Sequence, residues 1–202
     1  MPILKASKVY LFDEFEKDYQ NFMAESEGLD SPFIVYYRFL LKIYLYSVNN
    51  SHKTVFGTAK EGAAYFAKLP IVYVNKVKSL NFYLMEGYAK IKNYEQVEFY
   101  TQQNIELAQE GSSAWFKTYE TYTFATLHLG HYDKAAELLQ FIKSHELYEN
   151  QQPMLRDNLG FIDAHLFLLY ELGKYTPKTK EYKDYYSQPF NPTPFVSNLE
   201  VA

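Results

Sequence analysis

Residues 113–146 read SAWFKTYETYTFATLHLGHYDKAAELLQFIKSHE, and this stretch decides the fold class. It predicts two helices, 113–128 and 132–146, joined by Leu129-Gly130-His131-Tyr132. A connection this short makes two helices antiparallel neighbours. The stretch therefore predicts a helical hairpin.

The joint of this hairpin recurs elsewhere in the chain. Residues 91–94 (Ile-Lys-Asn-Tyr) and 172–175 (Leu-Gly-Lys-Tyr) share its pattern of an aliphatic residue followed by Tyr three positions later. The three tyrosines, Tyr94, Tyr132 and Tyr175, are 38 and then 43 residues apart. A period of about 40 residues with two helices in each unit is typical of an α-solenoid.

Helical periodicity dominates the rest of the chain. From Leu155, apolar residues recur at every third or fourth position as far as Leu172, which places them on one helical stripe. No segment shows the alternation of a strand, so we predict an all-α fold of about nine helices. Breakers such as Gly28, Pro70 and Gly111 divide the chain. The expected helices are 8–26, 32–47, 53–68, 71–91, 94–110, 113–128, 132–146, 153–172 and 177–186.

The length of 202 residues and the apolar content of 48% predict a single helical domain over residues 1–186. In it a capping helix precedes four hairpins, at 32–68, 71–110, 113–146 and 153–186. The last residues, 187–202, contain three prolines and cannot continue a helix. They form either a flexible tail or a segment that Phe190 and Phe195 anchor in a groove.

Composition excludes several functions. The net charge of −4, from 20 Lys+Arg and 24 Asp+Glu, provides no basic field for nucleic acid. With no cysteine, disulfides and thiolate chemistry are excluded. The most apolar run, 33–48, has 16 residues including Arg38 and Lys42, so it does not cross a membrane. It predicts a helix that is buried on all sides, either centrally or against another subunit. Residues 1–8 do not resemble a signal peptide, and we expect a soluble cytoplasmic protein.

The search for chemistry finds no catalytic pattern. The di-metal Glu-x-x-His pairs and the His-Glu-x-x-His motif are both missing. Gly57 and Gly62 have part of a phosphate-loop spacing but lack its lysine. His128 and His131 straddle the predicted turn. We therefore expect neither a metal nor another cofactor, and no enzymatic activity.

The joints resemble those of the tetratricopeptide repeat family. In that family the first helix ends in a Leu-Gly-x-Tyr-like turn, and a small residue follows three positions after the tyrosine. Gly130, Tyr132 and Ala135 match this pattern, and Gly173 repeats the glycine. The spacing between joints exceeds the family's period of about 34 residues. The resemblance implies hairpins stacked in a superhelix, with a generic helical bundle as the alternative.

The resemblance also implies a binding surface, because the first helix of each hairpin lines the concave face in this family. Aligning the joint tyrosines carries that face over to Phe82, Glu86, Lys90, Lys117, Glu120, Phe124, His128, Asp163, Phe167 and Tyr170. The set lacks a Lys and Arg cluster to clamp a terminal carboxylate. It suits an extended or helical peptide gripped by its aromatic members. The alternative is that these residues face solvent or a neighbouring helix.

Three functions remain open. The leading one is a non-enzymatic scaffold or adaptor that binds a protein or peptide. The second is an all-α small-molecule sensor or enzyme with an aromatic pocket, for which the 19% content of aromatic residues supplies the lining. The third is a structural subunit that forms a homodimer or larger homo-oligomer.

Overall fold

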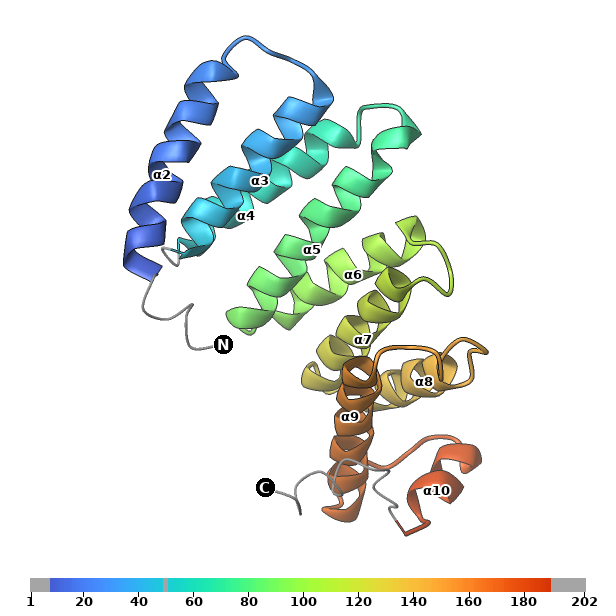
Figure 1. Cartoon of the computed structure of the whole chain (residues 1–202). Helices are drawn as coiled ribbons and strands as arrows, with labels where there is room; N and C mark the ends of the chain where they lie inside the picture. Colours follow the sequence, from blue (N-terminus) through green and yellow to red (C-terminus); the bar gives the residue numbers. More distant parts are fainter. Residues whose placement is uncertain (1–7, 49–50, 190–202) are drawn as a thin grey trace. The chain divides into compact units, whose positions relative to one another are not determined.

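The computed structural model describes residues 8–48 and 51–189, and their regular secondary structure is entirely helical (Figure 1). These ranges contain nine α-helices and one short 3-10 helix and no strand, so the predicted all-α fold is confirmed. The helices are α2 (Lys8–Glu25), α3 (Pro32–Val48), α4 (His52–Phe66), η1 (Ile71–Tyr73), α5 (Val74–Lys90), α6 (Tyr94–Leu107), α7 (Ser113–His128), α8 (Tyr132–Lys143), α9 (Pro153–Glu171) and α10 (Lys180–Tyr186).

Local capping explains where the observed helices differ from the predicted ones. The predicted helix 177–186 begins only at Lys180, because Thr179 caps α10: its side chain accepts a hydrogen bond from the Tyr182 N–H at 3.4 Å. The predicted helix 71–91 begins with the 3-10 helix η1 after Pro70, and α5 starts only at Val74. The remaining ends agree within a few residues.

The three similar joints adopt the same turn. Lys92, Gly130 and Gly173 all have a left-handed backbone, with φ of 58°, 76° and 67°. In each joint the next N–H donates to the carbonyl five residues earlier, as in the Schellman motif. These bonds are Asn93 to Tyr88 at 3.0 Å, His131 to Thr126 at 3.0 Å and Lys174 to Leu169 at 2.8 Å. The likeness seen in the sequence is therefore a likeness of backbone geometry.

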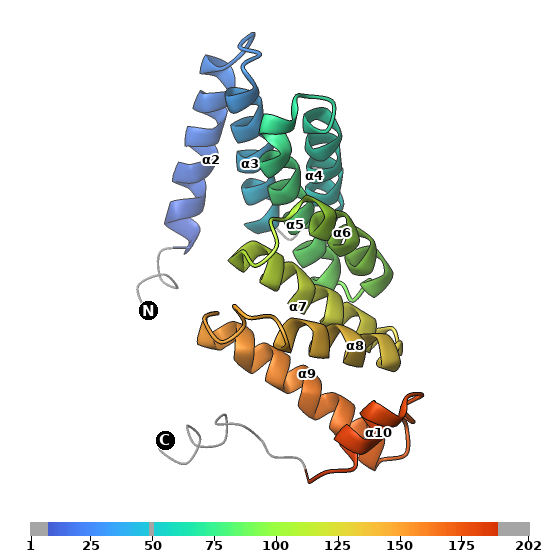
Figure 2. The same cartoon turned by 90° about the vertical axis from the view of Figure 1, so that its right-hand side faces the viewer.

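The chain divides into two compact units, Met1–Gly87 and Tyr88–Ala202, and the division falls inside α5. In the first unit α3 packs against α2 and α4 (Figure 2). Gly62 of α4 lies so close to α3 and α5 that an added Cβ would stand 2.9 Å from Leu80 and 3.0 Å from Phe39. Glycine at this position therefore permits the close approach of the three helices.

Two tyrosine hydroxyls on α3 bond to α5 within the first unit. Tyr36 lies 2.8 Å from the Ser79 hydroxyl, and Tyr44 accepts from the Tyr83 hydroxyl at 3.0 Å. The sequence predicts that this apolar helix is buried on all sides, either centrally or against another subunit. Central burial is wrong, because Phe33, Tyr44 and Val48 are exposed. The helix α3 has more apolar surface than its neighbours in the unit cover.

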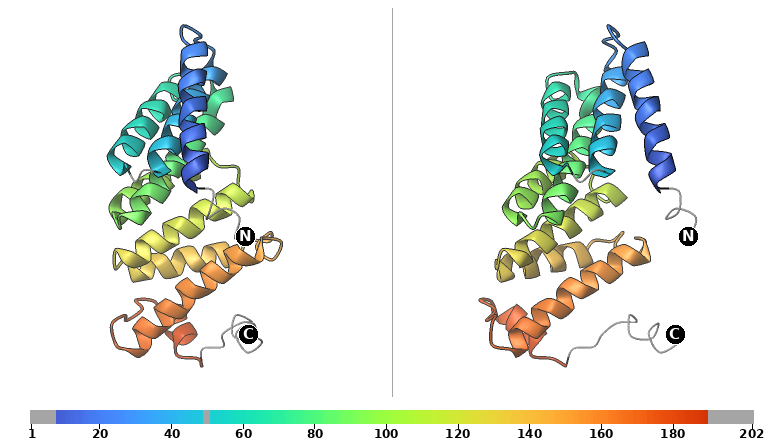
Figure 3. Two further views of the ribbon diagram at one scale, coloured as in Figure 1. Left: turned by 60° about the vertical axis from the view of Figure 1, so that its left-hand side comes forward. Right: turned by 90° about the vertical axis from the view of Figure 1, so that its left-hand side faces the viewer.

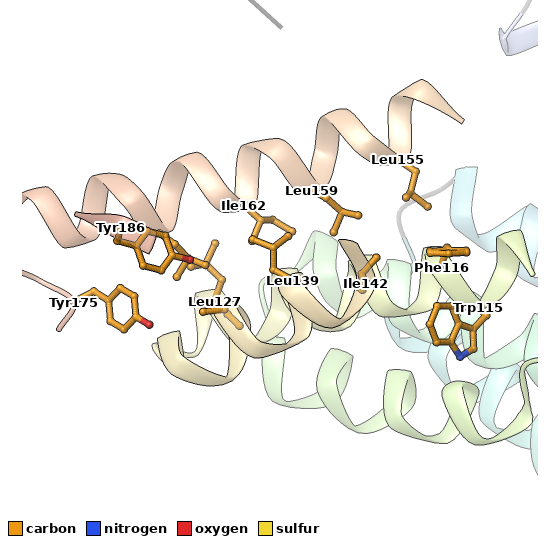
Figure 4. Packing of buried hydrophobic residues seen from close by; sticks show 13 residues of the cluster. Trp115, Phe116, Leu127, Leu139, Ile142, Leu155, Leu159, Ile162, Tyr175 and Tyr186 are labelled. Atoms are coloured by element: carbon orange, nitrogen blue, oxygen red, sulfur yellow. The ribbon is translucent and has the colours of Figure 1, made fainter. Parts of the chain in front are cut away.

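In the second unit α7 packs against α6, α8 and α9, and α8 packs against α9 (Figure 3). Side chains from α7, α8, α9 and α10 share one core (Figure 4). Leu139 and Ile142 of α8 are fully buried with Leu159 of α9, and Tyr186 of α10 closes the end of the cluster. Full burial of each such aliphatic side chain stabilises the fold by about 1.5–3 kcal/mol.

Candidate functional site

A buried carboxylate joins α7 to α9 in the second unit. Glu120 of α7 is only 7% exposed. It accepts hydrogen bonds from Asn158 Nδ2 of α9 at 2.9 Å and from Lys117 Nζ at 3.0 and 2.9 Å. Charge-assisted bonds of this kind are short and directional. They hold the two helices in a defined register.

About two turns after Glu120 on α7, aromatic rings gather around His128. Its imidazole stacks on Tyr94 of α6, with ring centroids 4.5 Å apart and planes 10° apart. Phe124 meets the same imidazole edge-on at 4.3 Å, and His165 of α9 lies 6.4 Å from it. We call Tyr94, Phe124, His128 and His165 the aromatic–histidine cluster. Stacked and edge-to-face rings at these distances attract one another beyond their burial, so these contacts help to hold the cluster together.

The protonation state of His128 follows from its surroundings. Partial burial between the rings lowers its pKa from the ordinary value of 6.5, and His165 and Lys92 lower it further through their positive charge. At pH 7 His128 is therefore mostly neutral. It presents an uncharged ring in the middle of the cluster.

A second apolar stripe runs along α9 beside this cluster. Phe161, His165, Leu168 and Leu172 follow one another at steps of 4, 3 and 4 residues, which places them on one face. All four are exposed. Phe161 is 52% exposed, and Phe124 of α7 is 38% exposed.

The register of α7 and α9 places the two phenylalanines at equivalent positions. Glu120 is bonded to Asn158, and His128 contacts His165. Phe124 lies midway between the two α7 residues, and Phe161 lies midway between the two α9 residues. We define the α7–α9 face as the aromatic–histidine cluster together with Phe161, Leu168 and Leu172. Tyr94 is half-buried and the other members are exposed, and the Glu120–Asn158 bond joins the same two helices.

A separate polar network lies on the other side of α9. Asp163 is buried, and its carboxylate accepts from Lys143 Nζ of α8 at 2.6 Å and from the Tyr185 hydroxyl of α10 at 2.7 Å. Burial raises the pKa of Tyr185, and the bond to Asp163 raises it further. Burial likewise raises the pKa of Tyr186, with Asp163 as the next cause. Asp163 thus ties α8, α9 and α10 together.

The structure distributes the predicted site residues over several environments. Lys117, Phe124 and His128 share the outward side of α7, and Glu120 lies buried at its border with α9. The α9 members lie elsewhere: Asp163 belongs to the buried network, and Phe167 and Tyr170 pack partly buried against the core. The exposed side of α9 is therefore rotated away from the residues that the alignment of joint tyrosines selected.

The other predicted residues lie apart from this face. Phe82 is half-buried and Glu86 exposed in the unit Met1–Gly87, while Lys90 is exposed at the end of α5. The predicted tail anchors, Phe190 and Phe195, lie outside the described residues.

Sequence reasoning missed several members of the α7–α9 face, although a signal for them was present. The 4, 3, 4 spacing from Phe161 to Leu172 indicates a second apolar stripe on α9, in addition to the stripe that starts at Leu155. The periodicity from Leu155 predicts Leu172 on the core stripe, yet Leu172 is exposed just beyond the end of α9 at Glu171. No signal in the sequence pointed to Tyr94 or Asn158 as partners, since both meet their neighbours only through packing.

Two further properties concern the described part of the chain. Across residues 8–48 and 51–189, no group of three or more His, Asp or Glu side chains is placed to hold a metal ion. None of the helices in these ranges is both long and apolar enough to cross a membrane. In comparisons with protein-family models, with curated proteins and with solved structures, no match to this chain is found.

Proposed function

We propose that the protein is a non-enzymatic helical module that binds a segment of another protein through the α7–α9 face. The observation that carries this proposal is the exposure of Phe124 and Phe161 on two packed helices, α7 and α9, which the Glu120–Asn158 bond joins. Exposed aromatic anchors on a rigid support are typical of interface hot spots. Rigid anchors also lose little conformational entropy when they bind.

Contacts between residues about one repeat length apart support a repeat architecture like that of the tetratricopeptide family. The α3–α5 bonds join residues 43 and 39 positions apart, and the Glu120–Asn158 bond spans 38. The joint tyrosines Tyr132 and Tyr175 also touch, at 5.6 Å. In a solenoid each unit meets the equivalent part of the next one, which produces contacts of this kind. The turn shared by the three joints also supports a repeat architecture.

The test uses a double variant with a matched control. Phe124→Ala/Phe161→Ala removes both rings, and Phe99→Ala removes a ring of α6 that is 49% exposed and lies outside the α7–α9 face. Each protein is captured from lysate of its source cells after cross-linking, and the helical circular dichroism signal shows that it is folded. A specific partner retained by the wild type and by Phe99→Ala but lost with the double variant supports the proposal. A partner retained by all three refutes it.

The exposed side of α3 favours a second candidate, a subunit that associates with its own kind. Phe33, Tyr44 and Val48 are exposed on this helix, and apolar patches of this sort mark protein contacts. The mass measured by light scattering over a range of concentrations would rise for such a subunit. Phe33→Ser/Val48→Ser would abolish the rise, whereas Val72→Ser, at an exposed position of η1, would not. A constant monomer mass excludes this candidate.

A further inference from the structure

Near His128 the α7–α9 face carries positive charge, whereas two exposed carboxylates of α9, Asp157 and Glu171, lie toward the ends of its apolar stripe. Among the groups that the structure describes, those acting electrostatically on His128 are Lys92, in the joint before α6, and His165 of α9. Tyr94 of α6 stacks its ring on His128, and Lys117, three turns earlier on α7, is already paired with Glu120. Lys92 is exposed. The apolar rings therefore lie next to two imidazoles and to Lys92, whose ammonium group is positively charged at neutral pH.

We propose that the α7–α9 face binds an acidic and aromatic segment of a partner protein, with an apolar side chain against Phe124 and Phe161 and a carboxylate among His128, His165 and Lys92. This inference rests on the proposed function and adds the chemistry of its partner. A carboxylate at this place gains charge-assisted bonds from the imidazoles and the ammonium group. A basic segment of equal hydrophobicity meets like charge there and is disfavoured.

Binding of such a segment is linked to proton uptake. Free His128 is mostly neutral at pH 7, because its surroundings lower its pKa. A bound carboxylate favours the imidazolium form and raises that pKa again. The complex therefore takes up a proton, and its affinity rises as the pH falls. Uptake of one proton increases affinity by at most about tenfold for each pH unit.

The test compares fluorescein-labelled peptides of equal length on the intact chain. One alternates Phe and Asp, the second alternates Phe and Lys, and the third alternates Ser and Asp. Fluorescence anisotropy is measured at about pH 6 and about pH 8, which bracket the ordinary histidine pKa. We expect the Phe–Asp peptide to bind more tightly than both others, and more tightly at the lower pH. Equal affinity of the Phe–Asp and Phe–Lys peptides overturns the inference, as does failure of the Phe–Asp peptide to bind.

Point variants separate the charge from the apolar contact. His128→Gln removes the titratable group, so the affinity of the Phe–Asp peptide becomes less dependent on pH. Lys92→Gln weakens that peptide at both pH values, while Lys68→Gln, which alters an exposed lysine of the other unit, leaves it unchanged. If His128→Gln keeps the full pH dependence, the cluster is not the site of proton uptake and the inference fails. If all Phe-containing peptides bind equally and Phe124→Ala/Phe161→Ala weakens them, the proposed function stands while the acidic specificity is refuted.

Discussion

Exchanging glycine for alanine at two exposed positions of the same unit changes stability in opposite directions. Gly130 lies in the joint between α7 and α8 with φ of 76°, and Gly160 lies within α9. A Cβ added at either position meets no atom within 4 Å, so neither substitution creates a clash. The difference between the two variants therefore reports backbone conformation alone.

The magnitudes follow from that difference. A left-handed backbone costs a residue with a Cβ about 1–2 kcal/mol, and the stiffer unfolded chain of alanine offsets roughly 0.5 kcal/mol of this cost. Gly130→Ala is therefore expected to lower the free energy of unfolding by about 1 kcal/mol. Gly160→Ala is expected to raise it by about 0.5–1 kcal/mol, because alanine is favoured in a helix.

Both variants are measured beside the wild type by urea and thermal denaturation, followed by circular dichroism at a helical wavelength. For a chain of this size, 1 kcal/mol corresponds to a shift in Tm of about 2–4 °C. Gly130→Ala should melt below the wild type and Gly160→Ala above it. If Gly130→Ala is as stable as the wild type, the joint does not need a left-handed residue and the likeness of the three joints has no energetic basis.

Three further predictions concern the same unit. Lys92→Gly should raise the free energy of unfolding by about 0.5–1 kcal/mol. The reason is that Lys92 has a left-handed backbone with φ of 58°, a conformation that glycine adopts in the other two joints. An unchanged urea midpoint contradicts this prediction. Asp163→Asn should lower that free energy by about 2 kcal/mol, because it leaves the Lys143 ammonium without its buried counter-charge; a loss below about 0.5 kcal/mol in the same titration would show that the bond is not structural. The lowered pKa of His128 means that the unfolded state binds the proton more readily, so its contribution to stability is present above pH 6.5 and disappears as the pH falls through the folded pKa. Denaturation at neutral and mildly acidic pH should therefore show a smaller acid-induced loss for His128→Gln than for the wild type, and equal losses would refute the assignment.

The helices and joints were predictable because their causes are local. The periodic apolar residues of α9, the Pro153 at its start and the Gly173 after its end act within a few residues of one another. The prediction failed at the start of α10, which was expected at residue 177 and lies at Lys180, after the cap Thr179. Sequence alone does not show which hydroxyl meets a free N–H at the start of a helix.

The candidate site was less predictable, because the sequence of a helix with two apolar stripes does not show which stripe is buried. On α9 the Leu155 stripe packs into the core and the Phe161 stripe remains exposed. The contacts that decide this come from α7, α8 and α10, which are distant along the chain. Asp163 illustrates the same point, since its position on the helix suggested a ligand-facing acid. In the structure its carboxylate accepts hydrogen bonds from Lys143 and Tyr185, so Asp163 has a structural role instead.

By itself, the sequence determined that this protein is helical, where its hairpins turn and that its joints repeat, since periodicity, glycine and proline act through the local backbone. Only the tertiary structure decided which side of each helix is left exposed. That side depends on the register between α7 and α9, which the Glu120–Asn158 bond and the His128–His165 contact define across 38 and 37 residues of chain. Packing between distant segments selects one register by the burial and pairing of all their side chains together, and no single segment contains that information.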